Sequence, residues 1–180
     1  MRAPFSTILL LISILGFTQE DTTTLTFLNN VIIRKNDTSS IYYTDKVNAG
    51  MYDYMMKKSL VKRTIKDIGN ATNDKLILTS EEVTYLKQHL ITAKDKIWSD
   101  NLFINSSRIS VDSTNSFLIQ NRNRDLYLFS QPIFIRNKTI ALFYEVHLCC
   151  GDIYGSVDLS FYKKNRDVWQ RWIRVDGGAF

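Results

Sequence analysis

The stretch TIALFYEVHLCCGDIYGSVDLSFYKKNRDVWQRWIRV, residues 139–175, decides the fold class. Successive side chains of a strand point to opposite faces. Ile140, Leu142, Tyr144, Val146 and Leu148 therefore share one face, while Ala141, Phe143, Glu145, His147 and Cys149 share the other. Residues 157–161 alternate between apolar and polar, which indicates a half-buried strand. The polar turn at 163–167 closes a hairpin with residues 168–175, and Gly177-Gly178 is expected to end the ordered part.

Further short strands are predicted upstream of this stretch. Apolar residues at 117–119, 126–129 and 133–135 favour three of them. Pro132 stands between the second and the third, and a turn at 136–138 follows the third. Proline cannot donate to a strand ladder, so it breaks the register or marks an edge. Residues 41–43 are a candidate strand near the start of the chain.

The first half of the chain carries helical patterns. Val47, Met51, Tyr54 and Met55 recur at helical spacing, capped by Thr44 or Asp45, and the same face continues through Val61, Ile65 and Ile68. Thr79 and Glu82 form a capping box that starts a second helix, over about residues 80–98. We therefore predict an α+β fold, with N-terminal helices packed on a C-terminal antiparallel β-meander.

The length of 180 residues fits one domain. Arg2 precedes an apolar run of about ten residues, Ile8–Phe17, which is typical of a secretory signal and too short to span a bilayer. We predict a signal peptide over residues 1–18 and a single domain over 19–180, exported to the periplasm or the cell surface. No later stretch is apolar for long enough to cross a membrane.

The chain is mildly basic, with a formal net charge of +5 that falls to +4 when Arg2 is removed with the leader. Two groups of basic residues stand out: Lys57, Lys58, Lys62, Arg63 and Lys66 form the first, and Lys163, Lys164, Arg166, Arg171 and Arg174 form the second. Such groups contact anionic lipid, polysaccharide or nucleic acid in some proteins. Solvated faces of a helix and a hairpin are favoured here, and export argues against nucleic acid.

Glu145, His147 and Cys149 form the most suggestive group for chemistry. A carboxylate beside an imidazole tunes a general base, and a thiol near a histidine can become a nucleophile. Neighbours at i and i+2 of a strand rarely converge on one atom, so the favoured interpretation places Glu145 and His147 on the less buried face of a sheet. No metal, nucleophile-elbow or phosphate-loop motif is present, and we predict no cofactor and no metal.

Cys149 and Cys150, the two cysteines of the chain, are adjacent. Three states stay open: two buried free thiols, which strand alternation favours, a strained vicinal disulfide, or pairing between molecules. Gly151 and Gly155 flank a connection whose Asp152 and Tyr154 are candidate ligand-binding residues, although a plain turn is favoured.

Aromatic residues are frequent in the predicted strands. They are expected to be core residues on one face, with a sugar- or peptide-binding platform as the alternative; they are Phe129, Phe134, Phe143, Tyr144, Phe161, Tyr162, Trp169 and Trp172. A Ca²⁺ cluster of Glu145, Asp152 and Asp158 matches no known loop spacing.

The segment from Ser130 to Val175 resembles a family of small exported proteins, typical of Bacteroidota, that has no assigned function. The matching residues are Ser130, Pro132, Lys138, Ala141, Leu142, Tyr144, Cys150, Gly151, Gly155 and Trp169, with a weaker match at Leu78–Glu82. The resemblance implies export and an α+β fold over about 100 residues, and it implies no reaction. The family's second loop cysteine falls at Tyr154 here, so its loop disulfide cannot form.

The sequence thus favours an exported non-enzymatic domain that binds an unknown protein or glycan. The first alternative is a small hydrolase in which His147 is the base, Glu145 orients it, and Cys149 or Cys150 is the nucleophile. The second alternative is an interaction or immunity-type protein.

Overall fold

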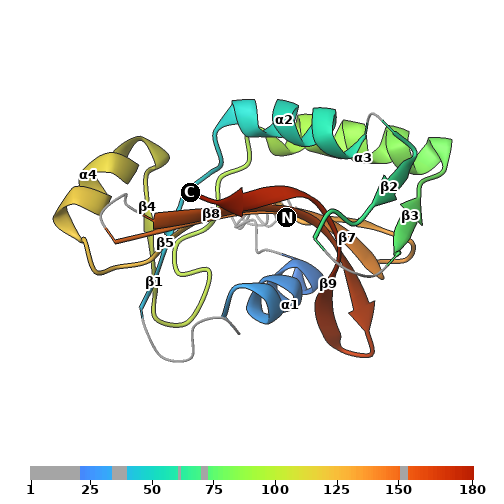
Figure 1. The fold of residues 1–180 in the computed structure, drawn as a ribbon. Helices are drawn as coiled ribbons and strands as arrows, with labels where there is room; N and C mark the ends of the chain where they lie inside the picture. The colour runs from blue at the N-terminus through green and yellow to red at the C-terminus, as the bar shows by residue number, and fades with distance from the viewer. Residues whose placement is uncertain (1–20, 34–39, 61, 70–72, 151–153) are drawn as a thin grey trace, which may run out of the picture.

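A seven-stranded sheet forms the middle layer of the molecule (Figure 1). The computed structural model describes residues 21–33, 40–60, 62–69, 73–150 and 154–180. Over these residues the strand order is β4-β1-β5-β7-β8-β9, and β6 pairs with β7 beside β5. The strands are β1 (Ile41–Thr44), β4 (Ser106–Ile109), β5 (Leu126–Phe129), β6 (Ile133–Ile135), β7 (Ile140–Cys149), β8 (Tyr154–Asn165) and β9 (Val168–Ala179). A separate antiparallel pair joins β2 (Thr64–Lys66) and β3 (Lys75–Ile77).

The sheet is mostly antiparallel, which confirms the predicted α+β class. The exceptions lie around β1, which runs parallel to both β4 and β5. Parallel neighbours need a long crossover, and residues 45–105 supply it between β1 and β4. β1 and β4, which both precede the predicted β-meander in the chain, therefore add two strands to its sheet.

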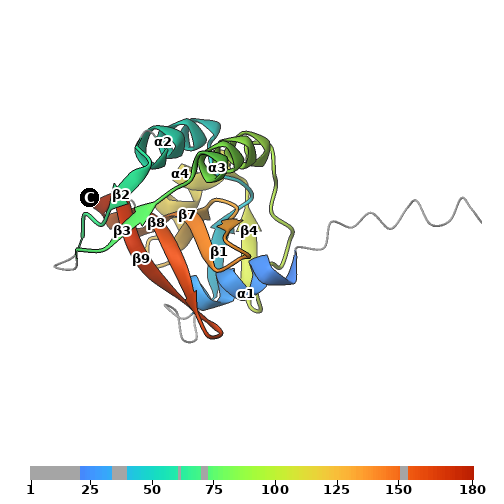
Figure 2. The same cartoon turned by 90° about the vertical axis from the view of Figure 1, so that its right-hand side faces the viewer.

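Helices lie on both sides of the sheet. The helices in the described part of the chain are α1 (Thr22–Val31), α2 (Ala49–Ser59), α3 (Ser80–Ala93) and α4 (Thr114–Gln120). A 3₁₀ turn at Val111–Ser113 directly precedes α4. Figures 1 and 2 show α2 and α3 side by side over one face and α1 over the other. None of these helices is long and apolar enough to cross a membrane.

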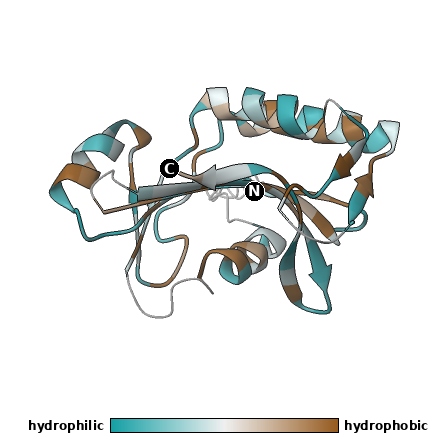
Figure 3. Ribbon diagram, viewed as in Figure 1, coloured by the Kyte–Doolittle hydropathy of each residue, from teal (hydrophilic) through white to brown (hydrophobic). Residues whose placement is uncertain are grey.

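Both faces of the sheet are buried, and each carries its own core. Tyr144 and Phe161 face α2 and α3, together with buried Leu86 and Leu90 of α3. The opposite core gathers aromatic rings around Phe27 of α1, whose centroid lies 5.0 Å from that of Phe143 and 5.1 Å from that of Trp169. The expectation that the aromatic residues share one core face is therefore wrong, because β7 alternates between two buried faces. Figure 3 shows hydrophobic residues on the helices and on the strands between them.

The β8–β9 hairpin bends away from the flat part of the sheet (Figure 1). Its register shifts twice, between Leu159 and Ser160 and between Phe161 and Tyr162. Such bulges increase twist and bend a strand, and this bend brings Trp169 against Phe27. Strand β9 continues through Gly177-Gly178 to Ala179, so the prediction that these glycines end the ordered part is wrong.

The predicted helix from Thr44 to Ile68 is shorter than expected. It begins after Asn48, whose side chain accepts a hydrogen bond from the Gly50 amide, and it ends at Ser59. Ile65 belongs to β2 instead. Val47 and Met55 are buried as predicted, whereas Met51 is exposed and Tyr52 is buried in its place. The predicted caps, Thr44 and Asp45, lie at the end of β1 and in the following turn, before the helix.

The second helix begins as predicted. The Thr79 hydroxyl accepts from the Glu82 amide, and the Glu82 carboxylate accepts from the Thr79 amide, which completes the capping box. The helix ends at Ala93, however, and leaves Ile97 exposed. The strand predicted at 117–119 is wrong, since these residues lie in α4 and bury Leu118 alone.

Candidate functional site

The predicted group on β7 does lie on one face of the sheet, but His147 takes a different partner. Its Nε2 lies 3.0 Å from Oδ1 of Asp125, and its ring stacks on Tyr127 with centroids 4.7 Å apart. Sequence reasoning missed Asp125. The signal was its place just before β5, because β5 pairs with β7 and sets Tyr127 opposite His147. The imidazole is thus held by Asp125, just before β5, and by Tyr127 of β5, two partners that the sequence analysis did not assign to it.

The Cys149 thiol is poorly suited to nucleophilic attack. The pKa of this thiol is raised to about 11, first by its hydrogen bond to Cys150 and then by burial. A thiolate is the reactive form of cysteine, and a thiol with such a pKa is almost fully protonated at neutral pH. The geometry therefore supplies a carboxylate–imidazole pair, and the Cys149 thiol on the same strand is not activated.

The two cysteines are free, but they are neither fully buried nor on opposite faces. Cys149 is half-buried and Cys150 is exposed. Their sulfurs lie 2.7 Å apart, which the strand-alternation argument did not anticipate. The reason is local: Cys150 has a φ of 60° and leaves the strand, so alternation ends at Cys149. Tyr154 is exposed and pairs with Cys149 across β7 and β8; Asp152 lies outside the described residues.

Glu145 is buried, so its expected place on a less buried face is wrong. Its solvent-exposed fraction is 7%, and it lies directly opposite Asp158 on β8. Asp158 is neutralised by Arg171, with Nη1 2.7 Å from Oδ2, and by Arg174 at 3.4 Å. The Ser160 hydroxyl also donates to Asp158. Such a fully engaged carboxylate is typical of a structural ion pair in a partly apolar layer.

A groove lies elsewhere, between the start of α3 and the turn that joins β6 to β7. Its volume is about 380 Å³, and we call it the α3–turn groove; its lining residues are Glu81, Glu82, Tyr85, Phe134, Ile135, Arg136, Asn137 and Lys138. Tyr85 is 41% exposed, and Phe134 is half-buried. The sequence analysis predicted the turn at 136–138 and the helix start at Thr79–Glu82 correctly. It could not predict that these two segments lie side by side in the fold. An exposed tyrosine in the first turns of a helix was the available signal.

The turn beside this groove has an uncommon backbone. Arg136, Asn137 and Lys138 have φ values of 51°, 54° and 59°, in the left-handed region that few non-glycine residues adopt. Such conformations cost free energy and persist when surrounding contacts impose them. Here Lys138 Nζ lies 3.2 Å from Asp21 Oδ2 before α1, and Arg136 bonds to the opposite side of the groove.

Arg136 and Glu82 fix the width of the groove. The guanidinium donates to both carboxylate oxygens, at 2.7 and 3.2 Å, and to the Ile77 carbonyl at 2.8 Å. The hydrogen bond from Arg136 is the main reason that the pKa of Glu82 lies below its ordinary value, and the same bond raises the pKa of Arg136. His89 packs against Tyr85 with centroids 3.8 Å apart. The groove walls are thus held in place on both sides.

The described residues contain no group of three or more His, Cys, Asp and Glu side chains placed to hold a metal ion. Comparison with known proteins found no matching family model, curated protein or solved structure.

Proposed function

We propose that this chain is an exported domain that binds a glycan in the α3–turn groove without acting on it chemically. The observation that carries the proposal is the composition of that groove. It brings together exposed Tyr85 and half-buried Phe134, the carboxylates of Glu81 and Glu82 at the start of α3, and the amide and ammonium groups of Asn137 and Lys138 on the turn.

Sugars are recognised by this combination of groups. The C–H face of a pyranose packs on an aromatic ring, and its hydroxyls donate to carboxylates and bond with amides. Tyr85 supplies an accessible ring, Glu81 an exposed carboxylate, and Asn137 an exposed amide. The volume of about 380 Å³ lies in the range of small-ligand sites. A groove of this size holds one or two sugar units of a longer chain.

Binding is better supported than hydrolysis. The hydrolase alternative needs a thiolate at Cys149 or Cys150 and a histidine oriented by Glu145. The raised pKa of Cys149 opposes the first requirement at that residue, and the Asp125–His147 contact gives the imidazole a carboxylate partner other than Glu145.

The cellular place of the protein follows from the predicted leader, residues 1–18, which lie outside the described residues. We propose export to the periplasm or cell surface, where glycans are abundant ligands. A protein segment is the alternative occupant of the groove, as an interaction or immunity-type role would require.

Calorimetric titration of the purified protein with oligomers of glucose and of N-acetylglucosamine tests the proposal. We expect Tyr85→Ala to weaken binding by about tenfold, because one stacked ring contributes on the order of 1 kcal/mol. Ile91→Ala is the matched control, since Ile91 is an exposed apolar residue of the same helix outside the groove. Absence of sugar binding, or an equal loss in both variants, contradicts the proposal.

A further inference from the structure

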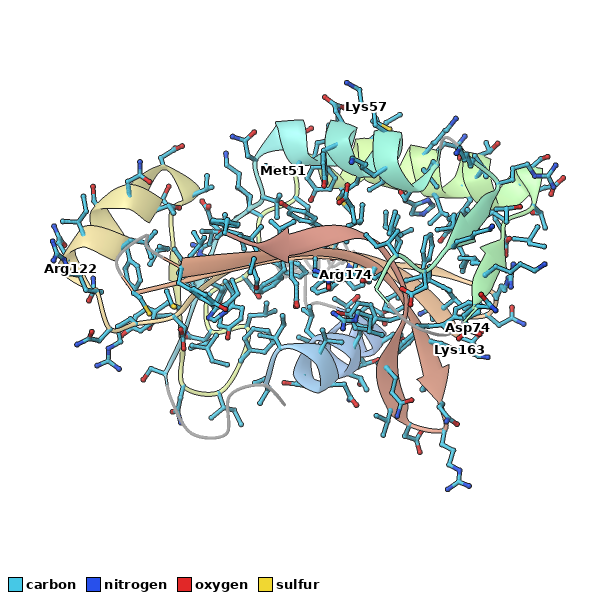
Figure 4. All side chains as sticks on the ribbon, viewed as in Figure 1. Met51, Lys57, Asp74, Arg122, Lys163 and Arg174 are labelled. Carbon is cyan, nitrogen blue, oxygen red and sulfur yellow. The ribbon has the colours of Figure 1, made fainter. Side chains whose placement is uncertain are left out.

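A second groove, lined by lysines, lies between the end of α2, β2 and β9. It occupies about 550 Å³ and shares no lining residue with the α3–turn groove; we call it the lysine groove, lined by Lys57, Lys58, Lys62, Thr64, Ile65, Lys66, Ile68 and Val175. The end of α2, strand β2 and strand β9 supply these residues. Figure 4 shows Lys57 pointing outward from α2.

The lysines of this groove differ in how they are held. Lys58 forms an ion pair with Asp176, and its ammonium lies 5.6 Å from the Tyr54 ring centroid. Lys57, Lys62 and Lys66 are exposed. Among the described residues, no acidic group forms an ion pair with any of these three. The groove therefore gathers positive charge that the described fold leaves uncompensated.

Within the described part of the chain, the nearby carboxylate of Asp67 forms no ion pair with these three lysines. Its Oδ1 accepts hydrogen bonds from the backbone amides of Arg174, at 2.8 Å, and Gly69, at 3.3 Å. These bonds fasten the end of β2 to the edge of β9, where the Ile68 amide also donates to the Arg174 carbonyl. The Asp67 side chain thus stabilises the backbone segments that form the groove.

The β2–β3 pair adds Lys75, a further exposed cation, close to the groove. Lys66 and Lys75 are direct cross-strand partners, and both are exposed. Like charges placed directly opposite on a sheet are destabilising, and a bound anion would relieve the repulsion. Nothing in the packing of the pair requires two lysines, because its buried residues are Ile65 and Leu76.

We propose that the lysine groove binds an acidic glycan chain, whose carboxylate or sulfate groups lie among Lys57, Lys62 and Lys66. Clefts lined by one sign of charge focus the electric field and attract ligands of opposite charge. Exposed ammonium groups around a hollow suit a chain with repeated anionic groups. A membrane surface is a poorer fit, because it favours protruding apolar side chains beside the cations, and Ile68 is the one exposed apolar residue in the described lining.

The test is a titration of the purified protein with polygalacturonate and with heparin, with neutral dextran as the uncharged comparison. We expect the double variant Lys62→Ser/Lys66→Ser to bind both acidic glycans about tenfold more weakly at low salt, since field focusing is lost with the charges. The binding of the natural protein should fall as salt rises, because exposed charges are screened.

The matched control is Lys87→Ser/Arg122→Ser, which removes the same charge from exposed positions outside the groove. Figure 4 places Arg122 at the far end of the molecule from Asp74, the residue that precedes β3. All four substitutions replace exposed side chains, and circular dichroism checks that both variants are folded. The proposal does not rest on the proposed sugar site, because Tyr85→Ala should leave acidic-glycan binding unchanged.

Three results would overturn the proposal: equal weakening in the lysine and control variants, binding that is independent of salt, or failure to bind either acidic glycan. Binding to anionic phospholipid vesicles is measured as a final comparison. Binding to vesicles that depends on Lys62 and Lys66, without binding to acidic glycans, would assign the groove to a lipid surface instead.

Discussion

Glu82 at the start of α3 and Arg136 in the β6–β7 turn form a two-bond ion pair between residues 54 positions apart in sequence. Glu82 also completes the capping box of its helix. The same carboxylate therefore caps its own helix and binds a residue far away in the sequence. Both partners of this ion pair line the α3–turn groove.

We predict that Glu82→Gln destabilises the protein by about 1 kcal/mol at neutral pH, because the charge paired with Arg136 is lost while glutamine can still complete the capping box. The pKa of Glu82 is lowered in the folded state, chiefly by Arg136. A lowered pKa contributes stability above the ordinary value of 4.5, and this contribution is lost as the pH falls through the folded-state value. The difference between wild type and variant should therefore shrink at acid pH.

Urea denaturation at several pH values measures this difference. Asp167→Asn is the control, because the Asp167 side chain is fully exposed at the tip of the β8–β9 hairpin. A stability difference for Glu82→Gln that is the same at all pH values would contradict the role given to its ionised form.

Gly177 and Gly178 provide a second prediction. Gly177 has a φ of 148°, and a methyl group there would run into the Val157 carbonyl; nothing lies within 4 Å of the same position at Gly178. We expect Gly177→Ala to cost about 1–3 kcal/mol, as strained backbone and close contacts do, and Gly178→Ala to be nearly neutral. Thermal unfolding of the two variants compares them directly, and similar melting temperatures would argue against this backbone geometry.

The lysine pair on β2 and β3 yields a third prediction. Lys75→Gln removes the charge opposite Lys66, so we expect a gain in unfolding free energy of about 0.2–1 kcal/mol at low salt. Added salt should stabilise the natural protein and reduce this gain, because it screens the repulsion. Lys87→Gln, on the exposed face of α3, serves as control. If Lys75→Gln is no more stable than this control, the two ammonium groups do not repel each other measurably.

The cysteines provide a fourth prediction. Because the pKa of Cys149 is raised chiefly by Cys150, we expect the Cys150→Ala variant to alkylate at Cys149 faster at neutral pH than Cys149 does in the natural protein. The rate with iodoacetamide, followed against pH by mass spectrometry of each cysteine, tests this. A natural Cys149 that reacts with a midpoint below neutral pH would restore the hydrolase alternative, especially if His147→Ala slowed it.

The sequence predicted the strands from residue 126 onward well, because alternation and turn residues are local signals, but it missed β4 and placed a strand where α4 lies. The segments 126–129 and 133–135 and the start of α3 match the structure. Helix ends were less accurate: the apolar residues Ile65 and Ile97 prolonged the helical pattern beyond Ser59 and Ala93, where tertiary packing ends the helices.

The candidate sites depended on contacts that no local pattern encodes. Asp125 reaches His147 because β5 pairs with β7, and Arg136 reaches Glu82 across the edge of the sheet. The closeness of Cys149 and Cys150 depends on one residue with positive φ. Side-chain alternation was sufficient to group Glu145 with His147, but it could not show that arginines from β9 surround the carboxylate opposite Glu145.

Nuclear magnetic resonance mapping of a bound neutral oligosaccharide tests the central claim most directly. Amide shifts are recorded on the isotope-labelled protein while an oligomer of N-acetylglucosamine is added. The account predicts that the largest shifts fall at Glu81, Tyr85 and residues 134–138, and that they disappear in Tyr85→Ala. Shifts that cluster instead around Asp125, His147 and Cys149, or no shifts at any sugar concentration, would contradict it.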